Sequence, residues 1–137
     1  MTELEPSGIL VEAEVEVRPS DDIEKVRTAL SKVLTGAIQI NETGQNRFSI
    51  RLQSKERSSL EKLKMIIQRD RIRTAARAVL NSHIEGETLE VFLNKQVAFA
   101  GHVSFCQPEG ESPLGPIRLV IRSTDLNGIV DWLTSGS

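Results

Sequence analysis

Three regularly spaced arginines are the residues of this sequence best suited to binding chemistry. Arg69, Arg73 and Arg77 follow one another at intervals of four residues, so on a continuous helix their guanidinium groups form one slanted stripe. A guanidinium donates two parallel hydrogen bonds that match a phosphate group. The spacing therefore favours a phosphate-binding helix face, with Lys62 or Lys64 as further contacts. The alternative is a solvated helix face, or arginines paired with carboxylates.

Charge is distributed so that a basic surface is available on an acidic protein. The chain has 137 residues, with 17 Lys and Arg against 19 Asp and Glu and a net charge of −2. Residues 55–77 carry eight basic and three acidic side chains, whereas residues 1–24 carry one basic and eight acidic. The overall acidity argues against a protein that coats nucleic acid by bulk charge. Four Phe, one Trp and no Tyr argue against an aromatic stacking platform for single-stranded bases.

The charges on the polar face of the predicted sheet can also pair with one another, which would leave that face without a binding role. Glutamates alternate with apolar residues along the predicted strand Leu10–Val17, and opposite charges on neighbouring strands can pair. In that case the polar face of the sheet is a lattice of ion pairs. Its expected members are Glu12, Glu14 and Glu16 with Arg47, Arg51, Arg118 and Arg122.

The sequence has no pattern typical of catalysis or of metal binding. His102 and Cys106 lie four residues apart, but no acidic or sulfur partner completes a metal site. Cys106 is the single cysteine, which excludes an internal disulfide and suits a reducing compartment. No glycine-rich phosphate loop occurs. We therefore predict a protein that is not an enzyme and that uses neither a metal nor another cofactor.

The elements that position these residues are predicted from hydrophobic periodicity. A helix is expected from Ile23 to Leu34, with Gly36 after it in a left-handed conformation. A longer helical pattern runs from Ser58 to Asn81, with a break at Asp70, which is expected to cap a second helix. A last helix begins near Thr124. The predicted strands are Leu10–Val17, Ala37–Ile40, Arg47–Gln53, Thr88–Leu93, Val97–Phe105 and Ile117–Arg122.

This order of elements predicts an α+β fold with a mostly antiparallel sheet and helices packed on one face. Residues 1–9 are polar, contain Pro6 and Gly8, and are expected to form a flexible tail. Residues 10–137 are expected to form a single domain. No apolar run approaches the roughly 18 residues of a membrane span, and the acidic start is unlike a signal peptide. We therefore expect a cytoplasmic protein.

Several longer stretches carry a resemblance to a known family. They are Arg71–Leu80, Phe92–Ala98, Pro113–Ile117 and Ile129–Leu133, preceded by Val11–Val26. In this order they resemble an uncharacterised archaeal family labelled RNA-binding, whose fold is similar to that of the 5S-rRNA-binding large-subunit ribosomal protein five. The resemblance implies an α+β domain, a homodimer and RNA binding. It directs attention to Arg71, Arg73 and Arg77, and to Asn94, Lys95 and Gln96.

The segment Asn94–Gln96 has two interpretations. It is predicted to be a tight turn between the strands Thr88–Leu93 and Val97–Phe105. An exposed amide–ammonium–amide tip could contact folded RNA. Equally, Asn tolerates the geometry of a turn, and Lys and Gln are ordinary residues at its tip.

Two functional hypotheses follow. The first is a module that binds structured RNA through phosphate contacts from Arg69, Arg71, Arg73, Arg77, Asn94, Lys95 and Gln96. The second is a homodimeric protein-interaction module with no RNA role. In that module Ala98, Ala100, His102 and Ser104 form a small-residue surface for a partner, and the basic stripe meets Glu12, Glu14 and Glu16 of another chain.

Overall fold

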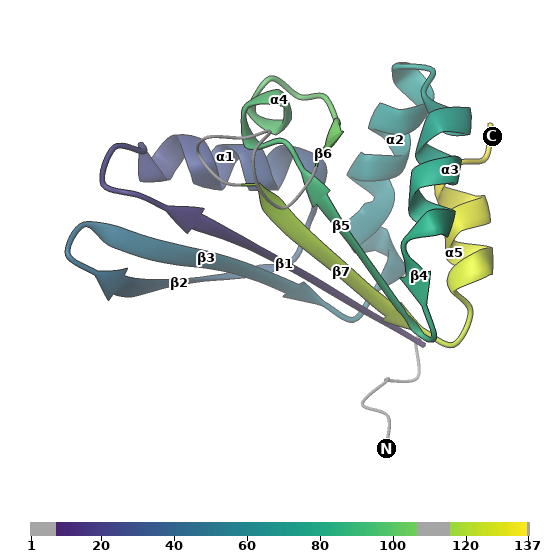
Figure 1. The fold of residues 1–137 in the computed structure, drawn as a ribbon, viewed down its shortest axis with the longest axis horizontal. Helices are drawn as coiled ribbons and strands as arrows, with labels where there is room; N and C mark the ends of the chain where they lie inside the picture. Colours follow the sequence, from purple (N-terminus) through teal and green to yellow (C-terminus); the bar gives the residue numbers. More distant parts are fainter. Residues whose placement is uncertain (1–7, 107–115, 137) are drawn as a thin grey trace.

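The protein is an α+β structure in which helices cover one face of an antiparallel sheet (Figure 1). The coordinates are a computed structural model that describes residues 8–106 and 116–136. Six strands follow the order β2-β3-β1-β7-β5-β4, and β6 pairs with β5 beside this path. All of the pairings are antiparallel. The predicted fold class is therefore confirmed.

The elements have the following bounds. The strands are β1 (Ile9–Val17), β2 (Ala37–Gly44), β3 (Arg47–Ser54), β4 (Ile84–Glu85), β5 (Thr88–Leu93), β6 (Phe105–Cys106) and β7 (Ile117–Ser123). The helices are α1 (Ile23–Val33), α2 (Glu61–Arg69), α3 (Arg73–Ser82), α4 (Lys95–Phe99) and α5 (Leu126–Leu133), and a short 3-10 turn, η1 (Arg57–Leu60), precedes α2.

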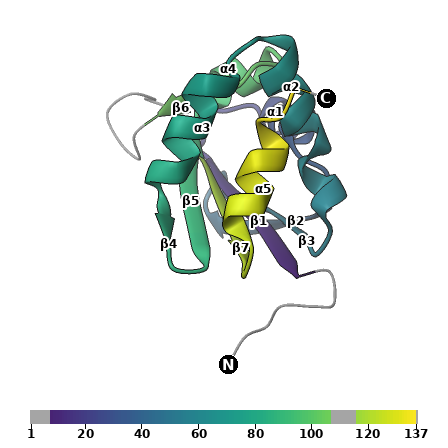
Figure 2. The ribbon, with the colours of Figure 1, turned by 90° about the vertical axis from the view of Figure 1, so that its right-hand side faces the viewer.

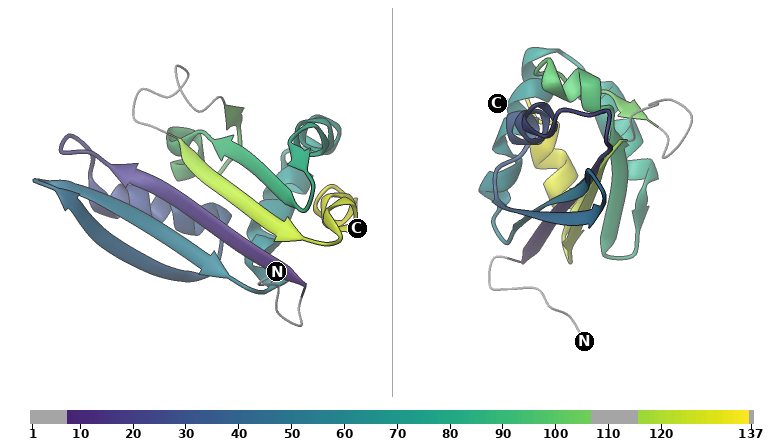
Figure 3. Two further views of the ribbon diagram at one scale, coloured as in Figure 1. Left: turned by 60° about the horizontal axis from the view of Figure 1, so that its bottom comes forward. Right: turned by 90° about the vertical axis from the view of Figure 1, so that its left-hand side faces the viewer.

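Strand β1 lies at the centre of the sheet, between β3 and β7 (Figure 3). Its valines and Ala13 are buried, whereas its glutamates lie on the opposite face. This alternation follows from the period of two in an extended chain. It fixes the register, because a shift by one residue would turn the apolar side chains to solvent.

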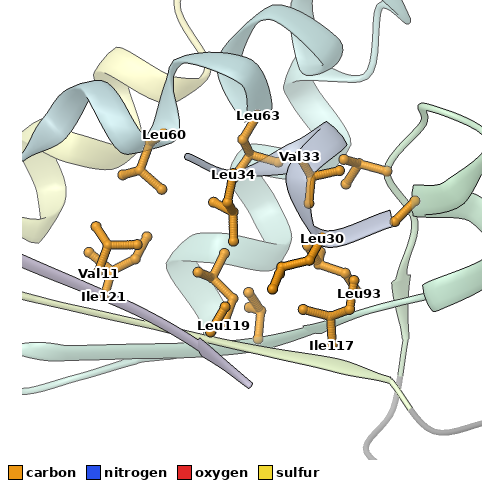
Figure 4. Packing of buried hydrophobic residues seen from close by; sticks show 14 of the residues in the cluster. Val11, Leu30, Val33, Leu34, Leu60, Leu63, Leu93, Ile117, Leu119 and Ile121 are labelled. Atoms are coloured by element: carbon orange, nitrogen blue, oxygen red, sulfur yellow. The ribbon is translucent and has the colours of Figure 1, made fainter. Parts of the chain in front are cut away.

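The core lies between the sheet and the helices (Figure 4). Two side chains of β7 face three leucines of the helix layer. On β7 these side chains are Ile117 and Leu119, and the leucines are Leu30 of α1, Leu34 at the end of α1 and Leu63 of α2. Each of these side chains is at most 1% exposed. Burying such a side chain stabilises the fold by about 1.5–3 kcal/mol. This packing holds α1 and α2 over the sheet.

The end of α1 differs from the prediction. Its last turn closes at Leu34, whose N–H donates to the carbonyl of Leu30 and whose backbone is extended. Gly36 is not left-handed. It is small for a different reason, because a Cβ there would lie 2.8 Å from the carbonyl oxygen of Gln53. The glycine is needed where the chain passes close to β3.

The predicted strand Val97–Phe105 is wrong over most of its length. Asn94 caps the short helix α4, and its Oδ1 accepts a hydrogen bond from the N–H of Val97 at 2.9 Å. Ala98 therefore points into the core. The expected surface of small residues for a partner does not form. Only Phe105 belongs to a strand, β6.

Other predicted segments lie wholly or partly outside the described residues. The tail predicted for residues 1–9 falls there up to position 7, and Ile9 already belongs to β1. The loop predicted between Phe105 and Ile117 falls there from 107 to 115.

Candidate nucleic-acid interface

The turn between α2 and α3 places an arginine in a backbone conformation that favours glycine. Arg71 has a φ of 59°. The N–H of Arg71 donates to the carbonyl of Gln68, and the N–H of Ile72 donates to that of Ile67. This pair of bonds is the Schellman motif, whose left-handed position usually carries glycine. A residue with a side chain costs about 1–2 kcal/mol there.

The helix therefore breaks where the sequence predicts a break, but for another reason. Asp70 ends α2 rather than capping α3. The N-cap of α3 is Ile72, and no side chain caps this helix. Its first N–H groups are consequently open to an anion or to water.

Three arginines meet in a hollow at this turn. Arg71, Arg73 and Arg77 line a depression of about 630 Å³, together with Gln68, Thr74, Thr134 and Gly136. Figure 2 shows that α5 lies between α2 and α3 and that its C-terminal end reaches the turn that joins these two helices. The residues after α5 therefore come close to the arginines. Gln68 binds the carbonyl of Gly136 through its amide at 3.2 Å. A Cβ at Gly136 would collide with the guanidinium of Arg73.

The three guanidinium groups differ in their partners. Arg77 pairs with Asp131 and donates to Oγ1 of Thr134 at 3.1 Å. Arg71 and Arg73 are exposed, and their guanidinium groups have no hydrogen bond or ion pair within the described parts of the chain. The hollow thus has more positive charge than its surroundings neutralise.

Arg69 does not join this cluster, so the stripe predicted on a continuous helix is wrong. Its guanidinium donates to the carbonyl of Gly101 at 2.6 Å and pairs with Asp70. His102 contacts the same carboxylate at 2.7 Å. Hydrogen bonds from Arg69 and then from His102 hold the pKa of Asp70 below its ordinary value. These contacts fasten the α2–α3 turn to the segment after α4.

The predicted Asn94–Gln96 tip is wrong as a turn and is only partly exposed. The side chain of Lys95 is 5% exposed, and its Nζ donates to the carbonyl of Glu16 and to Asp21. Burial lowers the pKa of Lys95, and the Asp21 carboxylate opposes that shift. Asn94 serves as a helix cap, and Gln96 alone is exposed.

The open face of the sheet, which is turned away from the helices (Figure 3), carries part of the ion lattice that the sequence suggested. Glu14 binds Arg51 at 3.2 Å, and Glu12 binds Arg122 at 3.1 Å. Arg118 pairs with Glu90, a partner that the sequence analysis did not name. Arg47 and Glu16 do not take part in these pairs within the residues that the structure describes.

Sequence reasoning missed the contribution of the chain after α5. Thr134 and Gly136 complete the arginine hollow, but Thr134 is 57 residues from Arg77. No local spacing indicates that contact. For the arginines of the hollow there was one further signal in the sequence. The family resemblance added Arg71 to the regularly spaced arginines, but it did not indicate Thr134 or Gly136.

Neither a metal cluster nor a membrane-spanning helix is found among the described residues. Across residues 8–106 and 116–136, no group of three or more His, Cys, Asp and Glu is placed to hold a metal ion. None of the helices in these ranges is long and apolar enough to span a membrane.

Comparison with known proteins gives one family. A family model described as "RNA binding" matches residues 10–123. A UPF0201 protein of Pyrobaculum aerophilum is 43% identical over 125 residues, which cover 90% of this chain and 87% of that protein. A UPF0201 protein of Metallosphaera sedula is 38% identical, and the match covers 86% of this chain and 82% of that protein.

The crystal structure of a UPF0201 protein from Methanococcus jannaschii has a TM-score of 0.83 and 25% identity, covering 92% of this chain and 99% of that one. The chain therefore belongs to the family of the UPF0201 proteins, and most of its length also matches the family model described as RNA binding.

Proposed function

We propose that this protein binds structured RNA through phosphate contacts made by Arg71, Arg73 and Arg77. The observation that carries the proposal is the arginine hollow, where two of three exposed guanidinium groups have no partner in the described residues. Unpaired planar guanidinium groups on one surface match the repeated phosphates of a nucleic-acid backbone. The family description supports RNA as the ligand.

The conformation of Arg71 adds a second argument. Strained backbone persists where the surrounding structure or a function requires it. Glycine would remove the strain at φ 59°, so the arginine side chain is kept at a cost to stability. The resemblance of the sequence to a family whose expected fold is similar to a 5S-rRNA-binding ribosomal protein favours a folded RNA over a single strand. Arg69 and Gln96 remain predicted as further RNA contacts, although Arg69 already donates to Gly101, whereas Asn94 and Lys95 have roles inside the fold.

The test is fluorescence anisotropy against 5S rRNA and transfer RNA across a salt series. With three phosphate contacts we expect a slope near −3 in a plot of log affinity against log salt. Replacing Arg71, Arg73 and Arg77 with Gln should lower affinity roughly 100-fold, at about 1 kcal/mol per contact.

A control variant removes the same charge elsewhere. Arg51, Arg118 and Arg122 on the open sheet face are replaced with Gln, so net charge changes equally. This variant should keep its RNA affinity within about threefold, because those groups already have carboxylate partners. Equal losses in both variants would mean that only net charge matters, and the hollow would not be the site.

The homodimeric alternative rests on a different observation. Strand β2 is an outer strand, and its eight residues contain no Lys, Arg or Pro. Such edges pair readily with another strand, and Ile40 on it is 37% exposed. We propose that two copies join along β2. Sedimentation should show a dimer that Ile40→Lys converts to monomer, and a monomer at all concentrations of the wild type would contradict this.

A further inference from the structure

An exposed aromatic ring close to two lysines lies outside the arginine hollow. Phe99, at the end of α4, is 39% exposed, an unusual state for a large apolar side chain in this protein. The ammonium of Lys32 lies 5.1 Å from the ring centroid, and that of Lys25 lies 6.0 Å from it. Both lysines come from α1, which packs against α4 (Figure 1).

The ring borders a hollow of its own between α1 and α4. This hollow has a volume of about 380 Å³. Val26 and Ala29 contribute an apolar floor beside Phe99, and Gln96 contributes an amide. The remaining lining residues are Ser20, Asp21, Asp22, Lys25 and Lys95.

The acidic groups of this hollow are already used within the fold. Asp21 pairs with the buried Lys95 and accepts from the N–H of Arg18 at 2.8 Å. Asp22 caps α1 by accepting from the N–H of Glu24 at 2.9 Å. The ammonium of Lys25 has no hydrogen bond or ion pair within the described ranges, so its charge remains available.

We infer that Phe99 stacks on one unpaired base of the bound RNA, while the Lys25 ammonium contacts the phosphate beside that base and Lys32 holds the end of α4 by donating to the carbonyl of Phe99 at 2.7 Å. This inference rests on the proposed function. Every base has a flat face that stacks on an aromatic ring, and neighbouring cations bind its backbone. The few aromatic residues argue against a platform for a run of bases, but one exposed ring suffices for one base in a loop or bulge.

The position of Phe99 relative to the arginine hollow supports this assignment. In Figures 1 and 2, α4 and the α2–α3 turn both lie along the upper side of the molecule. Arg69 spans the two by donating to Gly101, two residues after Phe99. A folded RNA lying on Arg71 and Arg73 can therefore present an adjacent unpaired base to the ring.

The experiment compares two RNAs with the same stem, one a hairpin with an unpaired loop and one a blunt duplex. Phe99→Ala should lower affinity for the hairpin about 5- to 150-fold, the range expected for losing one stacked base. Duplex affinity and the salt slope should not change, since no charge is removed. Met65→Ala is the matched control, because Met65 is 67% exposed and should not affect either RNA.

The outcomes separate this inference from the proposed function. Circular dichroism and urea unfolding first establish that the variants are folded. If the arginine variant loses both RNAs but Phe99→Ala loses neither, the stacking inference is overturned and the proposed function stands. If Phe99→Ala weakens both RNAs equally, the ring has no preference for an unpaired base and the inference also fails. If the wild type binds neither RNA, both are overturned.

Discussion

The open face of the sheet and the surface at the α2–α3 turn both carry arginines, but they use them differently. On the sheet, Arg51, Arg118 and Arg122 each have a glutamate partner on a neighbouring strand. At the turn, Arg71 and Arg73 have none among the described residues. Arginine content therefore does not identify a binding surface. What distinguishes the two regions is whether the carboxylate that neutralises each guanidinium is already supplied by the fold.

The distinction between paired and unpaired cations would fail if the buried Lys95 were an RNA contact. Lys95→Met leaves the Asp21 carboxylate, 4% exposed, without its ammonium partner. We expect a loss of about 3 kcal/mol in the free energy of unfolding, since breaking a buried pair leaves an uncompensated charge. Urea unfolding measures this loss.

The double variant Asp21→Asn with Lys95→Met should recover much of that stability, because the buried charge is then removed. RNA affinity of the folded fraction should be unchanged in both variants. A drop in affinity at full folding would place Lys95 on the interface after all.

Two substitutions of Arg71 separate the effect of its charge from the effect of its backbone strain. Arg71→Gly relieves the left-handed conformation and should raise the free energy of unfolding by about 1 kcal/mol. Arg71→Ala removes the same charge but keeps the strain. Both should weaken RNA binding alike and make the salt slope shallower by about 1. A glycine variant that binds RNA as well as the wild type would show that the strained arginine has another purpose.

The sheet lattice is expected to contribute little to stability. A double-mutant cycle on Glu14 and Arg51, which are 35% and 64% exposed, should give a coupling energy of roughly 0.2–1 kcal/mol. The coupling should shrink further at high salt. A coupling well above this range would mean that the lattice is a structural network and not merely a set of neutralised charges.

The smallest effect is expected at Asp70, which links the two halves of the helical surface. Its pKa is lowered in the folded state, so its charge stabilises the fold above the ordinary value of 3.8. That contribution is lost as the pH falls through the lowered pKa. Wild type should melt slightly higher than Asp70→Asn at pH 7, and the gap should close in acid. A gap that persists at low pH would contradict the assigned contacts.

The sequence predicted the parts of the fold that depend on local periodicity. The alternating β1 and the amphipathic α1 are found nearly where expected, and so is the break at Asp70. It failed at α4, where Val97 and Phe99 alternate as in a strand although a five-residue helix forms. A helix that short has too few turns to reveal its period, and the buried contact of Lys95 with Asp21 that accompanies it is made over 74 residues.

The candidate site was predictable only in part. Arg73 and Arg77 lie on one helix face as their spacing requires, but Arg69 is diverted to Gly101. The spacing could not reveal this because the Schellman turn rotates α3 away from α2. The sheet lattice was better foreseen, since cross-strand neighbours follow from alternation once the strand order is given.

The central position of β1 has a consequence for how the chain is made. Both neighbours of this first strand come later, and the β1–β7 ladder joins Ile9 to Ser123. During synthesis, one side of the valine-rich strand stays unpaired until β7 emerges from the ribosome. Closing so long a loop is entropically slow. The nascent chain therefore exposes one edge of this valine-rich strand until β7 appears, which makes that interval a period of risk for aggregation.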